Sequence, residues 1–308
     1  ISQSESLIKI RAVGLCSSDF DRLFRGKAYS YPMSPGHEIF GEVITPSDKA
    51  GKRVSIFPLL PCNKCPKCII GHFNLCWNYS YFGSRRPGAL ADFLKVPNWN
   101  IRTCPENLKD LYIPIIEPMS VVVHAFRKLQ RGKKSLVLTG SGFLTYLATK
   151  VAHHFGYSEV AIVTSSKRNH ELLSDYLYIP KQKSKLSKKY DACLDFSGNE
   201  ENLLKALELL DAKAKIVMIA NSREDTNILF PHREIILRRE LSIEGSWNSD
   251  FGYQDDDWQE AIKLLTELDS FDYPIRVVRL SELPIYLDSL RSNFSKIANE
   301  RIHVVTED

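Results

Sequence analysis

No stretch of this chain stays apolar over the roughly 18 residues that a membrane-spanning helix needs, so we expect no membrane partner. The first six residues lack the basic and apolar blocks of a signal peptide, which favours a cytoplasmic location. They also lack an initiator Met, so the natural start could precede Ile1. The net charge is only +4, and the lysine-rich stretch 181–189 has no interleaved aromatic residues. We therefore expect no nucleic-acid partner.

The length of 308 residues is enough for two domains, and the 44% hydrophobic content is ordinary for a globular protein. Short alternating segments at 6–13, 53–57 and 92–96, separated by Pro and Gly, predict a β-rich, partly barrel-like first part. Beyond Glu117, continuous apolar strands alternate with helices. This pattern is typical of an α/β fold whose parallel sheet is covered on both faces.

Four cysteines lie within fifteen positions, at Cys62, Cys65, Cys68 and Cys76. Tight Cys-x-x-Cys turns let a short loop supply the four thiolates of a tetrahedral zinc. A reduced cysteine-rich loop or a disulfide pair is the alternative, but two disulfides in so short a loop would be strained. We expect a structural zinc, because four thiolates leave no open coordination position.

Gly140 and Gly142 stand between a predicted strand at 135–139 and a predicted helix through His154. Backbone N–H groups at such a turn bind the pyrophosphate of a dinucleotide. The third fingerprint position holds Thr145 instead of glycine.

The end of the second predicted strand, at 159–164, lacks the carboxylate that grips the ribose in NAD-binding domains. Hydroxyl and cationic groups stand there instead, and these accept a 2′-phosphate. The alternative is the ordinary polar start of a helix, expected from about Lys167. We predict a preference for NADP(H) over NAD(H), with cofactor contacts from Thr164, Ser165, Ser166, Lys167 and Arg168.

Three separated segments offer ligands for a second metal, through Cys16, His37 and Glu117. A catalytic zinc takes three protein ligands and keeps a fourth position for water or substrate. Singly, each residue has a simpler explanation: a buried small hydrophobe, a core histidine and a charge at a helix N-terminus.

The order of these motifs resembles the zinc-dependent medium-chain alcohol and polyol dehydrogenases, from about residue 7 to 305. Finer matches, to members similar to galactitol-1-phosphate 5-dehydrogenase, lie at 58–62, 82–88, 123–126 and 237–247. The sequence departs from the family at Thr145 and at Val163, where the family usually has glycine and Asp.

This resemblance implies a GroES-like catalytic domain of residues 1–127 and 248–308, with a Rossmann dinucleotide-binding domain at 128–247. It implies that Cys16, His37 and Glu117 hold a catalytic zinc with Glu38 beside it, giving two zincs per chain. It also implies that Ser18 passes a proton from the substrate hydroxyl and that Asp19 steadies His37.

The expected activity is hydride transfer between a nicotinamide and a small molecule: a polyol, a ketose or a sugar or polyol phosphate. Simple alcohols or aldehydes are the alternative substrates, and we expect a homodimer or homotetramer. The motifs leave two other classes open. One is a catalytically impaired binding protein of the same fold, and the other is a zinc-ribbon nucleic-acid binder.

Overall fold

The computed structural model describes residues 4–129, 132–176, 189–222, 230–252, 256–291 and 300–307. The chain forms two compact units: a discontinuous unit of Ile1–Val121 with Asn248–Asp308, and a central unit of Val122–Trp247. Most of the lysine-rich stretch 181–189 lies outside the described residues. No helix in the described ranges is both long and apolar enough to cross a membrane.

The discontinuous unit is built on strands with alternating burial, as the sequence predicts. In β1 (Glu5–Gly14) buried and half-buried residues alternate from Glu5 to Arg11, so one face packs inward. The main sheet has the order β13-β14-β1-β2-β3-β7, and β6 also pairs with β1. Its other strands are β2 (Glu38–Thr45), β3 (Arg53–Ile56), β6 (Phe93–Pro97), β7 (Ile101–Thr103), β13 (Ile275–Arg279) and β14 (Arg301–Val305).

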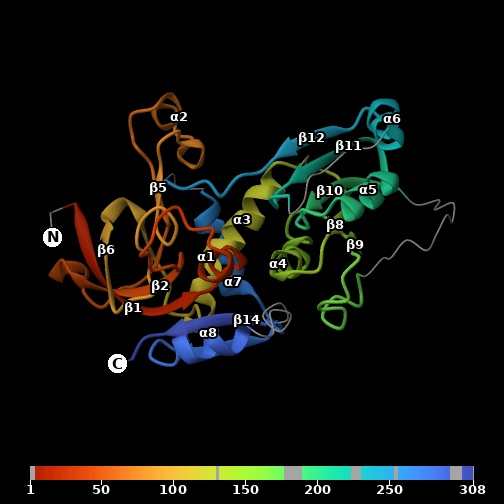
Figure 1. Cartoon of the computed structure of the whole chain (residues 1–308). Helices are drawn as coiled ribbons and strands as arrows, with labels where there is room; N and C mark the ends of the chain where they lie inside the picture. Colours follow the sequence, from red (N-terminus) through yellow and green to blue (C-terminus); the bar gives the residue numbers. More distant parts are fainter. Residues whose placement is uncertain are drawn as a thin grey trace. The chain divides into compact units, whose positions relative to one another are not determined.

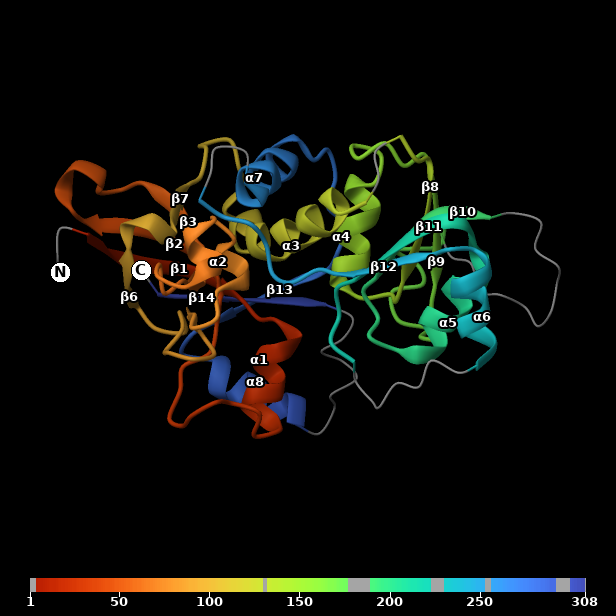
Figure 2. The same cartoon turned by 90° about the horizontal axis from the view of Figure 1, so that it is seen from above.

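Short helices surround this sheet. Apolar side chains of α1 (Ser17–Phe24) and α8 (Leu283–Arg291) share a core with β13 and β14, and the two helices lie side by side in Figure 2. A separate small sheet joins β4 (Leu59–Leu60) to β5 (Ser80–Tyr81). The remaining helices are α2 (Pro66–Ile69), α3 (Ile116–Arg127), which runs into the central unit, α7 (Asp257–Glu267), and the 3-10 turns η1 (Ser47–Lys49), η2 (Phe73–Leu75), η3 (Asn98–Asn100) and η4 (Asp110–Ile115).

The central unit holds the expected parallel sheet, with the order β12-β11-β10-β8-β9 in the described residues (Figure 1). Every pairing in it is parallel, and β8 is buried along its whole length, which is why its sequence is continuously apolar. The elements are β8 (Ser135–Thr139), α4 (Phe143–Val151), β9 (Glu159–Val163), β10 (Tyr190–Asp195), α5 (Glu200–Leu209), β11 (Leu210–Met218), α6 (Phe230–Arg238) and β12 (Ser242–Gly245).

The prediction of a helix from about Lys167 is wrong, because turns occupy residues 168–176. Side chains there hydrogen-bond to the local backbone: Arg168 N donates to Ser166 Oγ at 3.1 Å, and Asn169 has a positive φ of 55°. Such local bonds compete with helical ones.

One carboxylate joins two strands of the central sheet. Asp191 Oδ2 in β10 accepts from Ser135 Oγ at 2.8 Å and from the N–H groups of Ser135 and Lys134 at 3.2 and 3.3 Å. Burial raises the pKa of Asp191, but the hydrogen bonds from Ser135 and Lys134 and the charge of Lys133 outweigh it and lower the pKa.

We predict that Asp191→Asn lowers the free energy of unfolding at neutral pH by about 1–2 kcal/mol, because the amide oxygen keeps a weaker form of hydrogen bonds that contribute about 1.5–3 kcal/mol to a charged acceptor. Since the folded-state pKa is lowered, this stability is present above the unfolded pKa of about 3.9 and is lost as pH falls through the folded value. Urea unfolding between neutral and acid pH measures it, with the exposed Asp175→Asn as control. Equal acid sensitivity of the Asp191 variant and the wild type would contradict the prediction.

Candidate functional site: two clusters of metal-ligand side chains and a glycine turn

The first cluster is the cysteine loop. The structure brings Cys62, Cys65, Cys68 and Cys76 together, with all four Sγ atoms within 4.8 Å of one another. Cys65 Sγ lies 3.6 Å from Cys68 Sγ and 4.0 Å from Cys76 Sγ. All four are free thiols, so none is part of a disulfide.

Local sequence explains this geometry. Cys65 is the N-cap of α2 and Pro66 follows at the first helical position, which suits a helix start. One helical turn then brings Cys68 back beside Cys65. A hydrogen bond from the Trp77 backbone is the main cause that lowers the pKa of Cys65 to about 6, which favours the thiolate that binds metals.

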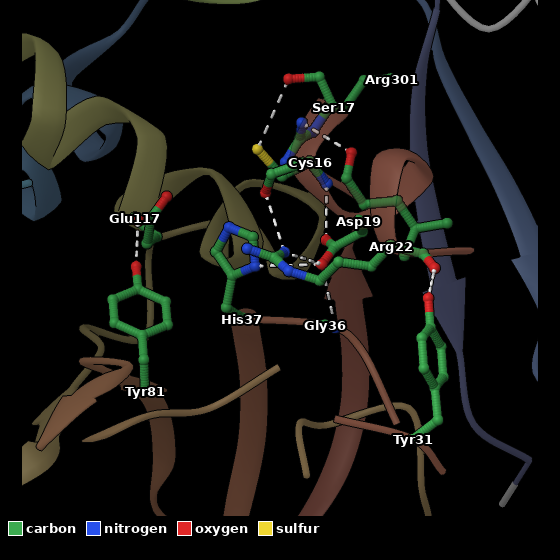
Figure 3. Close-up of polar contacts among 12 residues, drawn as sticks. Cys16, Ser17, Asp19, Arg22, Tyr31, Gly36, His37, Tyr81, Glu117 and Arg301 are labelled. Atoms are coloured by element: carbon green, nitrogen blue, oxygen red, sulfur yellow. Dashed lines mark hydrogen bonds and ion pairs between the residues drawn. The ribbon is translucent and has the colours of Figure 1, made fainter. Parts of the chain in front are cut away.

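The second cluster lies where β1 ends and β2 begins. Cys16, His37 and Glu38 each place a ligand atom within 4.8 Å of the others. Figure 3 shows Cys16 and His37 with the residues around them. Cys16 is the N-cap of α1, and His37 directly precedes β2. Burial alone would raise the pKa of Cys16, but hydrogen bonding and charge from His37 lower it to about 7.

Asp19 is fully buried and contacts both Cys16 and His37. Its Oδ2 accepts from the Cys16 N–H at 3.0 Å, and its Oδ1 lies 3.4 Å from His37 Nδ1. Arg22 Nη1 donates to Asp19 Oδ1 and to Ser18 Oγ, each at 3.0 Å. Burial raises the pKa of Asp19, but His37 and Arg22 lower it overall, so the carboxylate stays charged.

Glu117 lies in the first turn of α3 and is also buried, but it stands outside the 4.8 Å group. Tyr81 Oη donates to Glu117 Oε1 at 3.3 Å, and the Tyr81 ring meets the His37 ring edge-on at 5.8 Å between centroids (Figure 3). Burial raises the pKa of Glu117 against the charge of His37 and the hydrogen bond from Tyr81.

Glu38, one member of the cluster, forms an ion pair with Arg301 of β14. Arg301 Nη1 also donates to the Leu15 carbonyl at 3.0 Å. A Cβ on Gly14 would overlap the Glu38 carboxylate, so this close approach requires glycine there.

Sequence reasoning missed Tyr81, Arg22 and Arg301. Arg22 follows Ser18 by four residues, a helical spacing that would have placed the two side chains together. Tyr81 and Arg301 come from distant segments and carried no signal of their own.

The central unit forms the predicted glycine turn. Gly140 has φ of +88°, and its N–H donates to the Val163 carbonyl at 2.9 Å. Gly142 is the N-cap of α4, and no atom lies within 4 Å of a Cβ built on it, so the helix start is open to a ligand. Thr145 is buried, with its hydroxyl 3.4 Å from the Thr139 carbonyl.

The predicted cofactor segment divides into a buried and an exposed part. Thr164 is 2% exposed, and its Oγ1 accepts from the Ser166 N–H at 3.1 Å. Ser165, Ser166 and Lys167 are exposed, and Arg168 is half-buried. Val163 is fully buried in the apolar core, so the first exposed position after β9 is Ser165.

Two family profiles match the chain. The alcohol dehydrogenase GroES-like domain matches residues 2–106, and the zinc-binding dehydrogenase family matches residues 144–267. With the parallel sheet of the central unit, these matches confirm the expected GroES-like and Rossmann-like fold class.

Individual proteins agree with these profiles. The chain is 29% identical to galactitol 1-phosphate 5-dehydrogenase of Escherichia coli K12 over 86% of its length and 82% of that protein. It is 30% identical to L-galactonate-5-dehydrogenase of the same organism over 58% of this chain and 54% of that one. The crystal structure of galactitol-1-phosphate dehydrogenase from Escherichia coli has a TM-score of 0.86 at 24% identity, covering 99% of this chain and 93% of that chain.

Proposed function

Because the chain belongs to the zinc-binding alcohol dehydrogenase family, we propose that it transfers a hydride between NADP(H) and a polyol, a ketose or a phosphate ester of one. The observation that carries the proposal is the second cluster, where a thiol, an imidazole and a carboxylate meet around one buried point. Three protein ligands leave the fourth position of a tetrahedral zinc open for substrate, which four cysteines do not.

The cysteine loop is proposed to hold a structural zinc through Cys62, Cys65, Cys68 and Cys76. Four sulfurs about 2.3 Å from one zinc lie about 3.8 Å apart. The Sγ–Sγ distances of 3.6 and 4.0 Å from Cys65 are close to that value, which supports the proposal.

A second zinc is proposed at Cys16, His37 and Glu117, with Glu38 beside it. When bound, zinc polarises the carbonyl of the substrate or lowers the pKa of its hydroxyl. Glu38 is the carboxylate within 4.8 Å of Cys16 and His37, but its charge is already paired with Arg301. Glu117 is partnered by a phenol hydroxyl rather than a cation, which supports it as the third ligand.

The surrounding residues are proposed to position these ligands and to move the proton. Asp19 faces His37 Nδ1, so it orients the ring to present Nε2, as a carboxylate does behind a metal-bound histidine. Ser18 is the candidate to pass on the proton of the substrate hydroxyl: the half-buried Oγ would take up that proton as the serine gives up its own to solvent. Arg22 Nη1 donates to this Oγ at 3.0 Å and so fixes its position.

The substrate class rests on the relatives and on one row of side chains. Glu117 contacts Tyr81, Tyr81 packs edge-on against Tyr79 at 6.3 Å, and Arg85 stands 4.3 Å over the Tyr79 ring. Arg85 is exposed at the end of this row and suits a phosphate, which favours a polyol phosphate over a simple alcohol. A panel of polyols, sugar phosphates and simple alcohols, assayed with both cofactors, tests this choice.

The proposal includes a homodimer or homotetramer. Strand β12 is an edge of the central sheet in the described residues, and Ile243 on it is exposed. Such an edge is a common place for pairing with a second chain.

We predict that Cys65→Ser lowers the zinc content by one per chain and lowers the melting temperature, because metal binding at this loop contributes to folding. Elemental analysis and thermal unfolding measure both. Cys104→Ser changes another buried thiol outside the loop and should keep the full zinc content. Unchanged zinc and melting in Cys65→Ser would rule out this site.

His37→Ala should abolish turnover while the protein still folds and keeps one zinc per chain, since the cysteine loop is intact. Steady-state assays and metal analysis measure this, with the exposed His153→Ala as control. Substantial activity in His37→Ala would show that the reactive metal lies elsewhere.

The double change Lys167→Ala with Arg168→Ala should weaken NADPH by about a hundredfold or more relative to NADH, if each cation contributes about 1.5–3 kcal/mol to a phosphate contact. Ser165→Asp should shift preference toward NADH, because an exposed carboxylate repels the 2′-phosphate and accepts from the bare ribose. Cofactor titrations measure both, and Lys205→Ala on α5 is the control. Tighter NADH binding in the unaltered protein would reject the preference.

A further inference from the structure

Arg85 lies against two aromatic rings of the discontinuous unit. Its Cζ atom stands 4.7 Å from the ring centre of Tyr29 and 4.3 Å from that of Tyr79. A guanidinium stacks on the faces of aromatic rings and is attracted by them. Such contacts use the face of the guanidinium, so the N–H groups in its plane stay available to a ligand.

Arg85 has no acidic partner in the part of the chain that the structure describes. It is exposed, and its side-chain hydrogen bond there is a long one, from Nη2 to Tyr79 Oη at 3.4 Å. Arg22 of the same unit, by contrast, pairs with Asp19. A guanidinium presents five N–H donors in a fork that matches the oxygens of a carboxylate or a phosphate. Arg85 thus offers an oriented cation whose charge is not compensated by a neighbouring carboxylate.

Tyr79 connects Arg85 to both metal-ligand clusters. Its ring packs against the cysteine loop, and it directly precedes β5. Tyr81 of β5 packs edge-on against Tyr79, with 6.3 Å between the ring centres, and donates to Glu117. The contacts from Arg85 to the proposed zinc ligand therefore pass through two tyrosine rings, which places the guanidinium at a distance from the reacting carbon.

Tyr29 belongs to the segment that follows α1. Its side chain is 68% exposed, so the ring contributes little to the core. Two residues later, the Tyr31 hydroxyl donates to the Arg22 carbonyl at 2.7 Å, which fastens this segment to α1 (Figure 3). Since burial does not account for the position of Tyr29, its contact with Arg85 points to a role at the surface.

We propose that Tyr29 and Tyr79 orient Arg85 to bind the anionic end of an extended polyhydroxylated substrate, either a phosphate monoester or a carboxylate. The inference rests on the proposed dehydrogenase function, and it makes Tyr29 a positioning residue for substrate specificity. The guanidinium donates to two oxygens of the anion at once, whereas the end of a neutral polyol has no charge to pair with it. The anionic group and the reacting carbon stand at opposite ends of the substrate, because two rings separate Arg85 from Glu117 along the row.

The test measures binding without turnover. The zinc-loaded protein is saturated with NADPH, so that an added polyol cannot be oxidised, and calorimetry follows titrations with galactitol 1-phosphate, L-galactonate and galactitol. We expect at least one of the two anions to bind about tenfold or more tighter than galactitol, and Arg85→Ala to remove that difference. Hydrogen bonds to charged groups have this size. Which anion binds more tightly identifies the group as phosphate or carboxylate.

A double-mutant cycle separates the role of Tyr29 from general support of the fold. Tyr29→Ala should weaken binding of the preferred anion by about threefold, the size of an exposed cation–π contact, and should leave galactitol binding unchanged. Tyr29→Phe keeps the ring and should keep the affinity for the anion. In the Arg85→Ala background, Tyr29→Ala should have no further effect, because the two residues act through one contact.

The matched control is Arg25→Ala. Arg25 is an exposed arginine between α1 and Tyr29, and its guanidinium pairs with Asp21 at 3.1 Å. Its loss removes an equal charge and should leave the preference for the anion intact. A loss of preference as large as that in Arg85→Ala would mean that net charge selects the anion, which rejects an oriented site.

Two further results would overturn the proposal. Equal affinities for galactitol and for both anions would show that Arg85 is a solvated surface residue. A Tyr29→Ala effect that persists without Arg85, or that weakens galactitol equally, would mean that the ring only supports the fold. Either result leaves the dehydrogenase activity standing, since turnover is measured separately with NADP⁺. If no polyol is turned over while the anion preference follows the cycle, the proposed activity fails and the anion site stands.

Discussion

The buried carboxylate of Asp19 is the contact on which the arrangement of Cys16 and His37 in the discontinuous unit depends. It holds the N–H of Cys16, faces Nδ1 of His37 and pairs with Arg22, so one side chain joins the start of α1 to the start of β2. A buried carboxylate is stable only when such partners surround it. The same contacts therefore stabilise α1 and orient Cys16 and His37, which couples the fold to the proposed metal site.

A second ion pair, between Glu38 and Arg301, lies beside Cys16 and His37. Glu38 and Arg301 come from β2 and β14, on either side of β1, and they meet above Gly14 because glycine has no side chain there. Pairing with Arg301 compensates the charge of Glu38 inside the protein. Glu38 thus has a charged partner of its own, whereas the partner of the Glu117 carboxylate among the described residues is the Tyr81 hydroxyl. This difference in partners supports the different roles proposed for the two buried carboxylates.

In the central unit, the proposed cofactor contacts come from the backbone at the start of α4 and from side chains after β9. Gly142 leaves the start of α4 open, and the hydroxyl of Thr145 lies toward the Thr139 carbonyl. The buried Thr164 hydroxyl accepts from the backbone of the turn after β9, and Ser165, Ser166 and Lys167 of that turn are exposed to solvent. The sequence alone shows that no carboxylate directly follows β9. Only the structure shows which residues of that segment are exposed.

The sequence by itself determined what local spacing controls. Cysteines at 62, 65, 68 and 76 must approach one another because tight turns and one helical turn allow little else, and continuous apolar strands could only be buried on both faces. Only the tertiary structure decided the rest. It buried Thr164 and Val163, placed Tyr81 against Glu117 and paired Arg301 with Glu38. These contacts join residues up to 286 positions apart, as in the bond from Arg301 to Leu15, and the strand register that creates them is set by the packing of the whole sheet.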